Sequence, residues 1–175
     1  MTIGIILAGG KSSRFKNGDK ALFLDKSSNQ TWTEIAYRKL SALTEKTYIV
    51  ASHSNLPQIK KQLPSAHIVT DHSLFAGEGP LAGLYTVSSI AKNTHDYLIL
   101  AVDYPEISVQ SLTELLSVKN TYIKNNFTIA HLTFSHTQIQ DFLENKNRRM
   151  QDFLASIQAT SITLPEIELT NHNYQ

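Results

Sequence analysis

The sequence predicts an α/β protein with three layers (α/β/α), in which helices cover both faces of a mostly parallel, Rossmann-like sheet. Short apolar runs typical of buried strands alternate with longer stretches that carry apolar residues at helical spacing. Residues 97–102 form a strand-length run without a polar face, as expected where helices cover both sides of a sheet. Since 175 residues suit one domain with a sizeable core, we expect residues 1–175 to form a single domain.

The expected strands are short runs of aliphatic, β-branched and aromatic residues. The first leads directly into two glycines, and the second is centred on Tyr48, Ile49 and Val50. The polar residues 120–126 predict a loop or a hairpin before the fifth strand. In chain order, the expected strands are residues 2–7, 47–51, 67–70, 97–102, 127–134 and 161–164.

The expected helices are longer and amphipathic. The first begins a helical spacing at Trp32 and Ile35, and the second ends before Pro64. The third begins at Pro80, since proline is favoured in the first turn of a helix, and the fourth carries leucines on one face. The expected helices are residues 31–43, 56–63, 80–91, 109–118 and, for the most part, 139–157.

A glycine-rich turn with cations follows the first expected strand. Two glycines let the backbone turn sharply and approach a ligand, and their N–H groups can then face an anion. Arginine grips phosphate oxygens in a bidentate fork, and lysine adds a point charge. The spacing is neither that of a Walker A loop nor G-x-G-x-x-G, and an ordinary strand-to-helix turn is the alternative. We expect a nucleotide to bind at Leu7, Ala8, Gly9, Gly10, Arg14 and Lys20.

Two aspartates directly follow expected strands, Asp71 after residues 67–70 and Asp103 after residues 97–102. The carboxyl ends of parallel strands share one edge of a sheet, where ligands of such folds bind. We expect Asp103 to hold Mg²⁺, which takes its other ligands from phosphates and water. The alternatives are that Asp103 belongs to a structural turn and that Asp71 caps the next segment instead of binding a base or ribose.

A second glycine-rich turn spans residues 77–83. Pro80 can start a helix whose N-terminal N–H groups face a ligand. Gly83 permits close packing, or close approach of a ligand, within the first helical turn. We therefore expect Gly79, Pro80 and Gly83 to line the nucleotide site, although a plain loop–helix junction has the same pattern.

Composition excludes several classes of function. The net charge of +1 does not favour a nucleic-acid partner. The sequence has no cysteine, and its seven histidines show no metal-binding spacing. No apolar run approaches the length of a membrane span, and no leader sequence is evident. We expect a cytoplasmic protein with no membrane partner.

Taken together, the motifs resemble those of the molybdenum cofactor guanylyltransferase family, which belongs to the nucleotidyltransferases with a nucleotide-diphospho-sugar transferase type of fold. The similarity extends over nearly the whole chain. It is carried by L-A-G-G-K-S-S-R-F, Asp19-Lys20, Asp71, G-P-L-A-G, Asp103-x-Pro105, Asn147-Arg148-Arg149-Met150 and Asn171-His172-Asn173.

The resemblance implies that GMP passes from GTP to molybdenum-bearing molybdopterin, with Mg²⁺ as cofactor and pyrophosphate as the second product. It also implies contacts with other proteins of molybdenum cofactor biosynthesis and with molybdoenzymes. Residues 1–105 would bind the nucleotide and residues 106–175 the acceptor. By resemblance, Lys20 and Arg14 bind phosphates, Asp103 binds Mg²⁺, and these three residues are catalytic. Asp71 holds the nucleoside, and Arg148, Arg149, Asn171 and Asn173 face the acceptor.

Two other kinds of function remain open. One is a molybdopterin cytidylyltransferase or another transferase of the NTP-sugar type. The other is a non-catalytic protein that binds a nucleotide or the cofactor. The second is motivated by Ala51-Ser52-His53, which stands where many relatives have asparagine.

Overall fold

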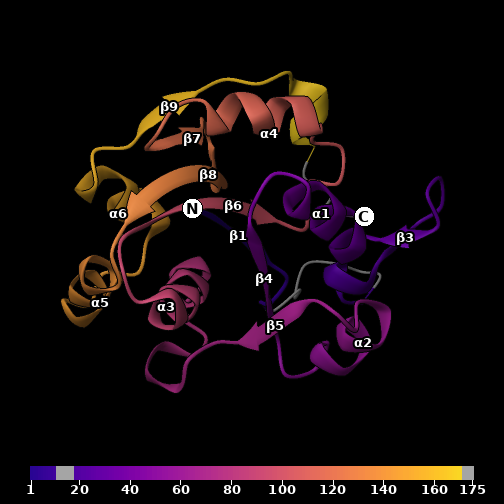
Figure 1. Ribbon diagram of the computed structural model, residues 1–175, viewed down its shortest axis with the longest axis horizontal. Helices are drawn as coiled ribbons and strands as arrows, with labels where there is room; N and C mark the ends of the chain where they lie inside the picture. The colour runs from indigo at the N-terminus through magenta and orange to yellow at the C-terminus, as the bar shows by residue number, and fades with distance from the viewer. Residues whose placement is uncertain (11–17, 171–175) are drawn as a thin grey trace.

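The computed structural model describes residues 1–10 and 18–170. The strands of its main sheet are β1 (Thr2–Leu7), β4 (Lys46–Ala51), β5 (His67–Thr70), β6 (His95–Ala101), β7 (Thr121–Ile123), β8 (Asn126–Phe134) and β9 (Thr160–Ile162). They form a seven-stranded sheet in the order β5-β4-β1-β6-β8-β7-β9 (Figure 1). A separate small hairpin consists of β2 (Leu24–Asp25) and β3 (Gln30–Thr31).

Helices cover both faces of the main sheet, as the sequence predicts. The helices on one face are α1 (Trp32–Ser41), α2 (Leu56–Gln62) and α4 (Val109–Leu116), and those on the other are α3 (Pro80–Ala91), α5 (His136–Glu144) and α6 (Met150–Ser156) (Figure 1). Three short 3-10 helices are η1 (Lys20–Leu22), η2 (Ser73–Phe75) and η3 (Glu166–Leu169). Within residues 1–10 and 18–170, no helix combines the length and the apolar character that crossing a membrane requires.

The sheet separates two hydrophobic clusters. Successive side chains of a strand point to opposite faces, so Ile5 packs with α3, α5 and α6 whereas Ile6 packs with α1, α2 and α4. Both isoleucines are fully buried. The central strand thus needs apolar residues on both faces, which confirms the three-layer α/β/α class predicted from its sequence.

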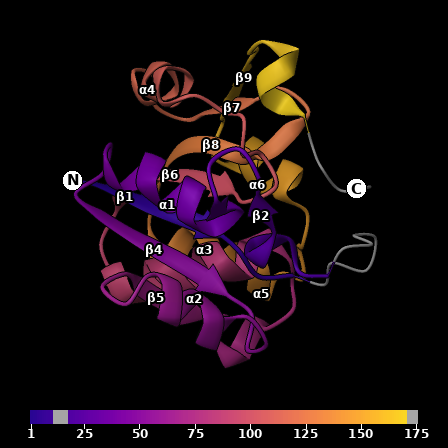
Figure 2. The ribbon, with the colours of Figure 1, turned by 90° about the vertical axis from the view of Figure 1, so that its right-hand side faces the viewer.

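The strand order reverses direction at the centre of the sheet. β1 is parallel to both neighbours, with Ile6 in register with Ile49 of β4 and Leu100 of β6. β5 lies beyond β4 and is also parallel, and α3 then carries the chain back to β6 on the other side of β1. Figure 2 shows β1 with the N-terminus at the amino edge of the sheet. The carboxyl ends of β1, β4, β5 and β6 therefore meet at the opposite edge, where such sheets bind ligands.

The structure divides the helix expected over residues 139–157. α5 begins earlier because Ser135 and Gln138 form a capping box, in which each side chain accepts from the other residue's N–H group. Residues 145–149 then separate α5 from α6. Lys146 has a φ of 62°, a left-handed conformation that interrupts a right-handed helix.

Residues 120–126 form a hairpin, one of the two predicted alternatives. β7 and β8 pair antiparallel, and Asn125 takes up the positive φ of 66° in the turn between them. β8 is also antiparallel to β6, whereas β9 is parallel to β7. The sheet is therefore mostly parallel, with one strand running against its neighbours.

The hydroxyl of Tyr97 gives a test of the core. This oxygen is buried without a hydrogen-bond partner in the described part of the chain, and burial raises the pKa of Tyr97 from 10.0 to about 12. We expect Tyr97→Phe to raise the free energy of unfolding by about 1 kcal/mol, because the desolvation of the hydroxyl is uncompensated. Urea denaturation followed by circular dichroism would measure this change.

The same measurement above neutral pH provides a second check. In the wild type, the unfolded tyrosine loses its proton near pH 10, before the folded one does. The wild type should therefore lose stability as pH rises toward 12, and the advantage of Tyr97→Phe should grow. A less stable variant at pH 7 would contradict the prediction.

Candidate active site

A cavity of about 1000 Å³ lies at the carboxyl edge of the sheet, where β1 and β6 end. Every residue that was predicted to bind the nucleotide or Mg²⁺ and that lies in the described part of the chain lines this cavity. These residues are Leu7, Ala8, Gly9, Gly10, Lys20, Asp71, Gly79, Pro80, Gly83 and Asp103. The fold thus brings together groups that are up to 96 positions apart (Leu7 to Asp103, 103 − 7).

Backbone groups form the first wall. The N–H group of Ala8 donates to the carbonyl oxygen of Val50 at 2.9 Å and so continues the pairing of β1 with β4. A Cβ atom at Gly9 would lie 3.4 Å from the backbone that follows β4, so glycine lets these segments lie close. Gly10 has a φ of 119°, where an L side chain would be strained. The predicted phosphate ligand Arg14 lies outside the described residues.

An ion pair joins the two predicted ionic residues. Lys20 Nζ lies 3.3 Å from Asp103 Oδ2, and the side chains are 16% and 17% exposed. Lys20 begins η1, whose N-cap Asp19 accepts a hydrogen bond from the N–H group of Ala21 at 2.9 Å. Asp103 is fixed from the other side, since the N–H group of the preceding residue donates to the last carbonyl of β1 at 3.2 Å. A cation and a carboxylate are therefore held side by side, largely shielded from water.

Asp71 lies where β5 ends. Burial raises the pKa of the Asp71 carboxyl, while a hydrogen bond from the N–H group of Gly77 at 3.3 Å and the charge of His53 oppose this shift. The bond ties the end of β5 to the glycine-rich turn before α3. A half-buried carboxylate in this position can accept hydrogen bonds from N–H or O–H groups of a ligand.

The N-terminus of α3 forms the next wall. Its N-cap Gly79 has φ 73° and ψ −156°, a combination essentially restricted to glycine. Glycine offers no capping side chain, and the N–H groups at the start of a helix favour an anion. A Cβ atom at Gly83 would come within 2.9 Å of Leu7 Cδ2 and 3.3 Å of Val50 Cγ1, so this glycine permits close packing of α3 on the sheet.

Several residues of the cavity were missed in the sequence. Ser52, His53 and Ser54 contribute the turn after β4, and Thr128 comes from β8. No motif marks Thr128; it reaches the cavity because β8 is antiparallel to β6, so the beginning of β8 lies near the end of β6. The turn after β4 could have been anticipated, because every parallel strand of the sheet delivers its following residues to this edge.

Arg148 and Arg149, which were expected to face the acceptor, are not part of the cavity wall. Arg148 Nε donates to Glu78 Oε2 at 2.7 Å, and its guanidinium lies 5.8 Å from the ring centroid of Phe75. Arg148 thus links the α5–α6 connection to the glycine-rich turn. Of residues 106–170, Thr128 alone lines the cavity. Asn171 and Asn173 lie outside the described residues.

Asp19, Asp71 and Asp103 line the cavity, and among the described residues Asp103 alone forms an ion pair with Lys20. Within the described chain, no group of three or more His, Asp or Glu side chains is arranged to hold a metal ion. Asp103 therefore suits a hard cation that takes few ligands from the protein and the rest from phosphates and water, as Mg²⁺ does.

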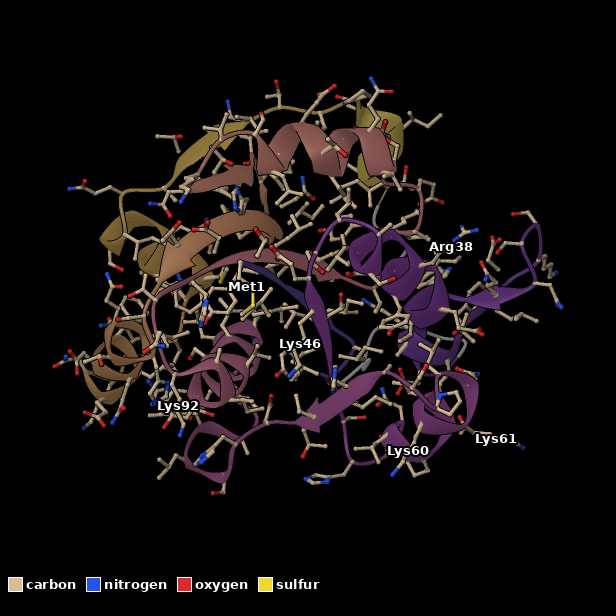
Figure 3. All side chains as sticks on the ribbon, viewed as in Figure 1. Met1, Arg38, Lys46, Lys60, Lys61 and Lys92 are labelled. Atoms are coloured by element: carbon tan, nitrogen blue, oxygen red, sulfur yellow. The ribbon has the colours of Figure 1, made fainter. Side chains whose placement is uncertain are left out.

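The basic groups at the amino edge of the sheet are remote from this chemistry. Met1 precedes β1, Lys46 begins β4 and Lys92 follows α3 (Figure 3). None of them lines the cavity, where Lys20 is the one Lys or Arg side chain among the described residues.

Comparison with known proteins identifies relatives over most of the chain. Residues 4–159 match the family described as MobA-like NTP transferase domain. A protein of Geobacillus sp. (strain WCH70) named "Probable molybdenum cofactor guanylyltransferase" is 32% identical over 117 residues, which cover 67% of this chain and 57% of that protein. The protein of the same name from Bacillus cereus (strain Q1) is 30% identical over 176 residues, which cover 94% and 85%. The chain thus spans little more than half of the first relative.

The fold itself has counterparts among solved structures. The crystal structure of molybdopterin-guanine dinucleotide biosynthesis protein A from Archaeoglobus fulgidus superimposes with a TM-score of 0.68. The alignment covers 97% of this chain and 86% of that one, at 14% identity. At this identity the likeness concerns the fold alone, and it confirms the predicted nucleotide-diphospho-sugar transferase type.

Proposed function

Since the chain belongs to the MobA-like NTP transferase domain family, we propose that it transfers GMP from GTP to molybdenum-bearing molybdopterin and releases pyrophosphate. One observation carries the proposal: a glycine-rich turn, a Lys–Asp ion pair, a half-buried aspartate and a helix N-terminus surround one cavity at the switch point of the sheet. The relatives named molybdenum cofactor guanylyltransferase support the choice of substrates.

The phosphates of GTP lie, on this proposal, between the glycine-rich turn and the N-terminus of α3. Backbone N–H groups of Gly9 and Gly10 and those at the start of α3 donate to phosphate oxygens. Lys20 adds a full positive charge at the same place. Arg14 is proposed as a further phosphate ligand and as a catalytic residue, on the basis of its motif.

The nucleoside lies on the side of Asp71. The carboxylate of Asp71 accepts hydrogen bonds from the base or the ribose, and the adjacent His53 contributes to the same wall. A carboxylate accepts and does not donate, so it favours a base edge that presents N–H groups. Guanine presents two adjacent donors, N1–H and the 2-amino group, which supports GTP over CTP.

Asp103 is the residue that would hold Mg²⁺. When bound there, the ion would neutralise charge on the triphosphate. Lys20 exchanges its partner Asp103 for a phosphate oxygen as the nucleotide enters. Both groups keep their places, because one is fixed by η1 and the other by the backbone next to β1.

The chemical step needs little covalent help from the protein. An oxygen of the terminal phosphate of molybdopterin forms a bond to the α-phosphorus of GTP, while the bond from that phosphorus to the bridging α–β oxygen breaks and pyrophosphate leaves. Positioning and charge neutralisation supply the rate. The acceptor enters on the side of Thr128 and residues 106–175, which form with residues 1–105 a single domain on this proposal. We place the reaction in the cytoplasm, with other proteins of molybdenum cofactor biosynthesis and molybdoenzymes as partners.

Titration of the purified protein with GTP, CTP, ATP and UTP, each with Mg²⁺, tests the substrate. We expect the tightest binding for GTP, followed by pyrophosphate release when molybdopterin is added. Preference for CTP would indicate a cytidylyltransferase. Nucleotide binding without pyrophosphate release would indicate a non-catalytic binding protein.

Lys20→Ala tests the phosphate contact. A partly buried charge–phosphate contact contributes about 1.5–3 kcal/mol, so GTP affinity should fall by about tenfold or more. The matched control is Lys26→Ala, which removes the same charge from an exposed position. Equal GTP affinity of Lys20→Ala and the control would remove Lys20 from the site.

Asp103→Ala tests the metal ligand. We expect turnover to fall by about two orders of magnitude, because several kcal/mol of charge stabilisation are lost from the transition state. Circular dichroism and thermal unfolding should show an intact fold. Mg²⁺-dependent activity close to that of the wild type would show that the ion is held elsewhere.

A further inference from the structure

We infer that Asn55 is a positioning residue that fixes Ala8 and Asp19 relative to one another and thereby sets the geometry of the nucleotide site. The inference rests on the proposed function for its catalytic meaning. Its structural part is a clamp from Asn55 to residues 47 and 36 positions earlier in the chain, and it depends on hydrogen bonds within the protein alone.

The side chain of Asn55 is buried and its hydrogen bonds are directed toward the site. The residue is 1% exposed. Its Nδ2 donates to the carbonyl oxygen of Ala8 and to Asp19 Oδ2, both at 2.9 Å. Its Oδ1 accepts from the N–H group of Ser52, also at 2.9 Å. Both amide hydrogens of Asn55 are therefore donated to Ala8 and Asp19, the two residues on either side of residues 9–18.

These bonds differ from the usual role of asparagine at this position. Asn55 is the N-cap of α2, where an asparagine oxygen normally accepts from N–H groups of the first helical turn. Here the side chain makes no such bond. Its amide group is directed instead toward Ala8 and Asp19. Burial of a polar side chain costs free energy unless hydrogen-bond partners compensate for the lost water, and these two residues are the partners of the Asn55 amide group. The contacts thus serve the cavity wall and not the helix.

The clamp continues to the ion pair through one carboxylate. Asp19 Oδ2 accepts from Asn55, and Asp19 Oδ1 accepts from the N–H group of Ala21 at 2.9 Å. Between these anchored residues stands Lys20, whose Nζ lies 3.3 Å from Asp103. Both oxygens of Asp19 are engaged, so its orientation is fixed, and with it the start of η1 and the backbone of Lys20.

At its other end, the clamp holds the glycine-rich turn. The carbonyl group of Ala8 immediately precedes Gly9, and both Ala8 and Gly9 line the cavity. If Asn55 released Ala8 and Asp19, the N–H groups of Gly9 and Gly10 and the ammonium of Lys20 could separate. Each could still bind a phosphate, but the triphosphate would have to order them, at a cost in affinity.

Two variants interrupt the clamp from opposite sides. Asn55→Ala removes both donors. Asp19→Ser keeps an N-cap acceptor for Ala21 but is too short to reach Asn55. In each variant we expect GTP affinity, measured by titration with Mg²⁺, to fall by about tenfold, since a buried hydrogen-bond partner is lost. The double variant should be little weaker than Asn55→Ala, because Asn55→Ala already breaks the contact that Asp19→Ser removes.

Hydrogen exchange in the ligand-free protein supplies an independent readout. The N–H groups of Ser52 and Ala21 depend on the clamp, directly or through Asp19. We expect both to exchange about tenfold faster in Asn55→Ala, while the N–H group of Ala8, bonded to Val50 in the sheet ladder, changes less. Asn120→Gly is the matched control. It removes an asparagine oxygen that accepts from the N–H group of Thr133 at 2.8 Å, away from the cavity, and its φ of 51° suits glycine.

The outcomes separate this inference from the proposed function. Weaker GTP binding in both clamp variants and faster exchange in Asn55→Ala, with affinity unchanged in Asn120→Gly, would support it. Unchanged affinity in the clamp variants, or unchanged exchange at Ser52 and Ala21 in Asn55→Ala, would overturn it. Failure of the wild type to bind any nucleotide would contradict the proposed function, and the exchange rates would still decide on the clamp. If Asn55→Ala does not fold, Asp19→Ser tests the same contact.

Discussion

The parallel pairing of β1 with β4 on one side and β6 on the other is the constraint on which the cavity depends. The pairing continues past the strand ends, through the bonds from Ala8 N–H to Val50 and from Val102 N–H to Leu7. The positions of the glycine-rich turn and of Asp103 therefore follow from backbone hydrogen bonds and do not depend on side-chain contacts. A shift of β6 by one residue would turn Asp103 to the other face of the sheet, and Lys20 would lose its partner. The buried apolar side chains of β1 and β6 oppose such a shift, because it would move residues such as Ile5, Ile6 and Ile99 from one hydrophobic cluster to the other.

Much of this fold was predictable because the decisive signals are local. The first strand ends at Leu7, just before the Ala8-Gly9-Gly10 turn, and α3 begins at Pro80, so both were predicted with the observed bounds. Strand direction is not a local property: the apolar run of β8 reads the same whether it lies parallel or antiparallel to β6. The break between α5 and α6 was also missed, because it depends on the backbone conformation of Lys146, a residue type that is common within helices. The strands β2 and β3 have two residues each, too few to show a periodic pattern.

In the site, too, some residues could be placed from local sequence signals, whereas others depend on strand direction or on contacts that only the structure shows. Residues next to strand ends, such as Asp71 and Asp103, could be placed on one edge of the sheet from the sequence, since parallel strands bring their carboxyl ends together. Thr128 could not, because its position requires the antiparallel direction of β8. Asn55 was hidden for another reason. An asparagine before a helix has an adequate local explanation as an N-cap, and only the structure reveals that its side chain bonds to Ala8 and Asp19 instead.

The contact between Lys20 and Asp103 explains how such a site remains stable before its substrate arrives. A single partly buried charge is unfavourable, and each of these two groups neutralises the other. On the proposed function, the incoming triphosphate supplies an anion for Lys20 and its accompanying cation a charge for Asp103, so neither group is left unpaired. The exchange requires that both groups stay in place as their partners change. Asp103 is held by the β1–β6 ladder, whereas Lys20 lies on a short 3-10 turn whose position is fixed through Asp19. The position of Lys20 relative to Asp103 therefore depends on the residue that fixes Asp19. That residue is Asn55, whose buried amide group donates to the Asp19 carboxylate.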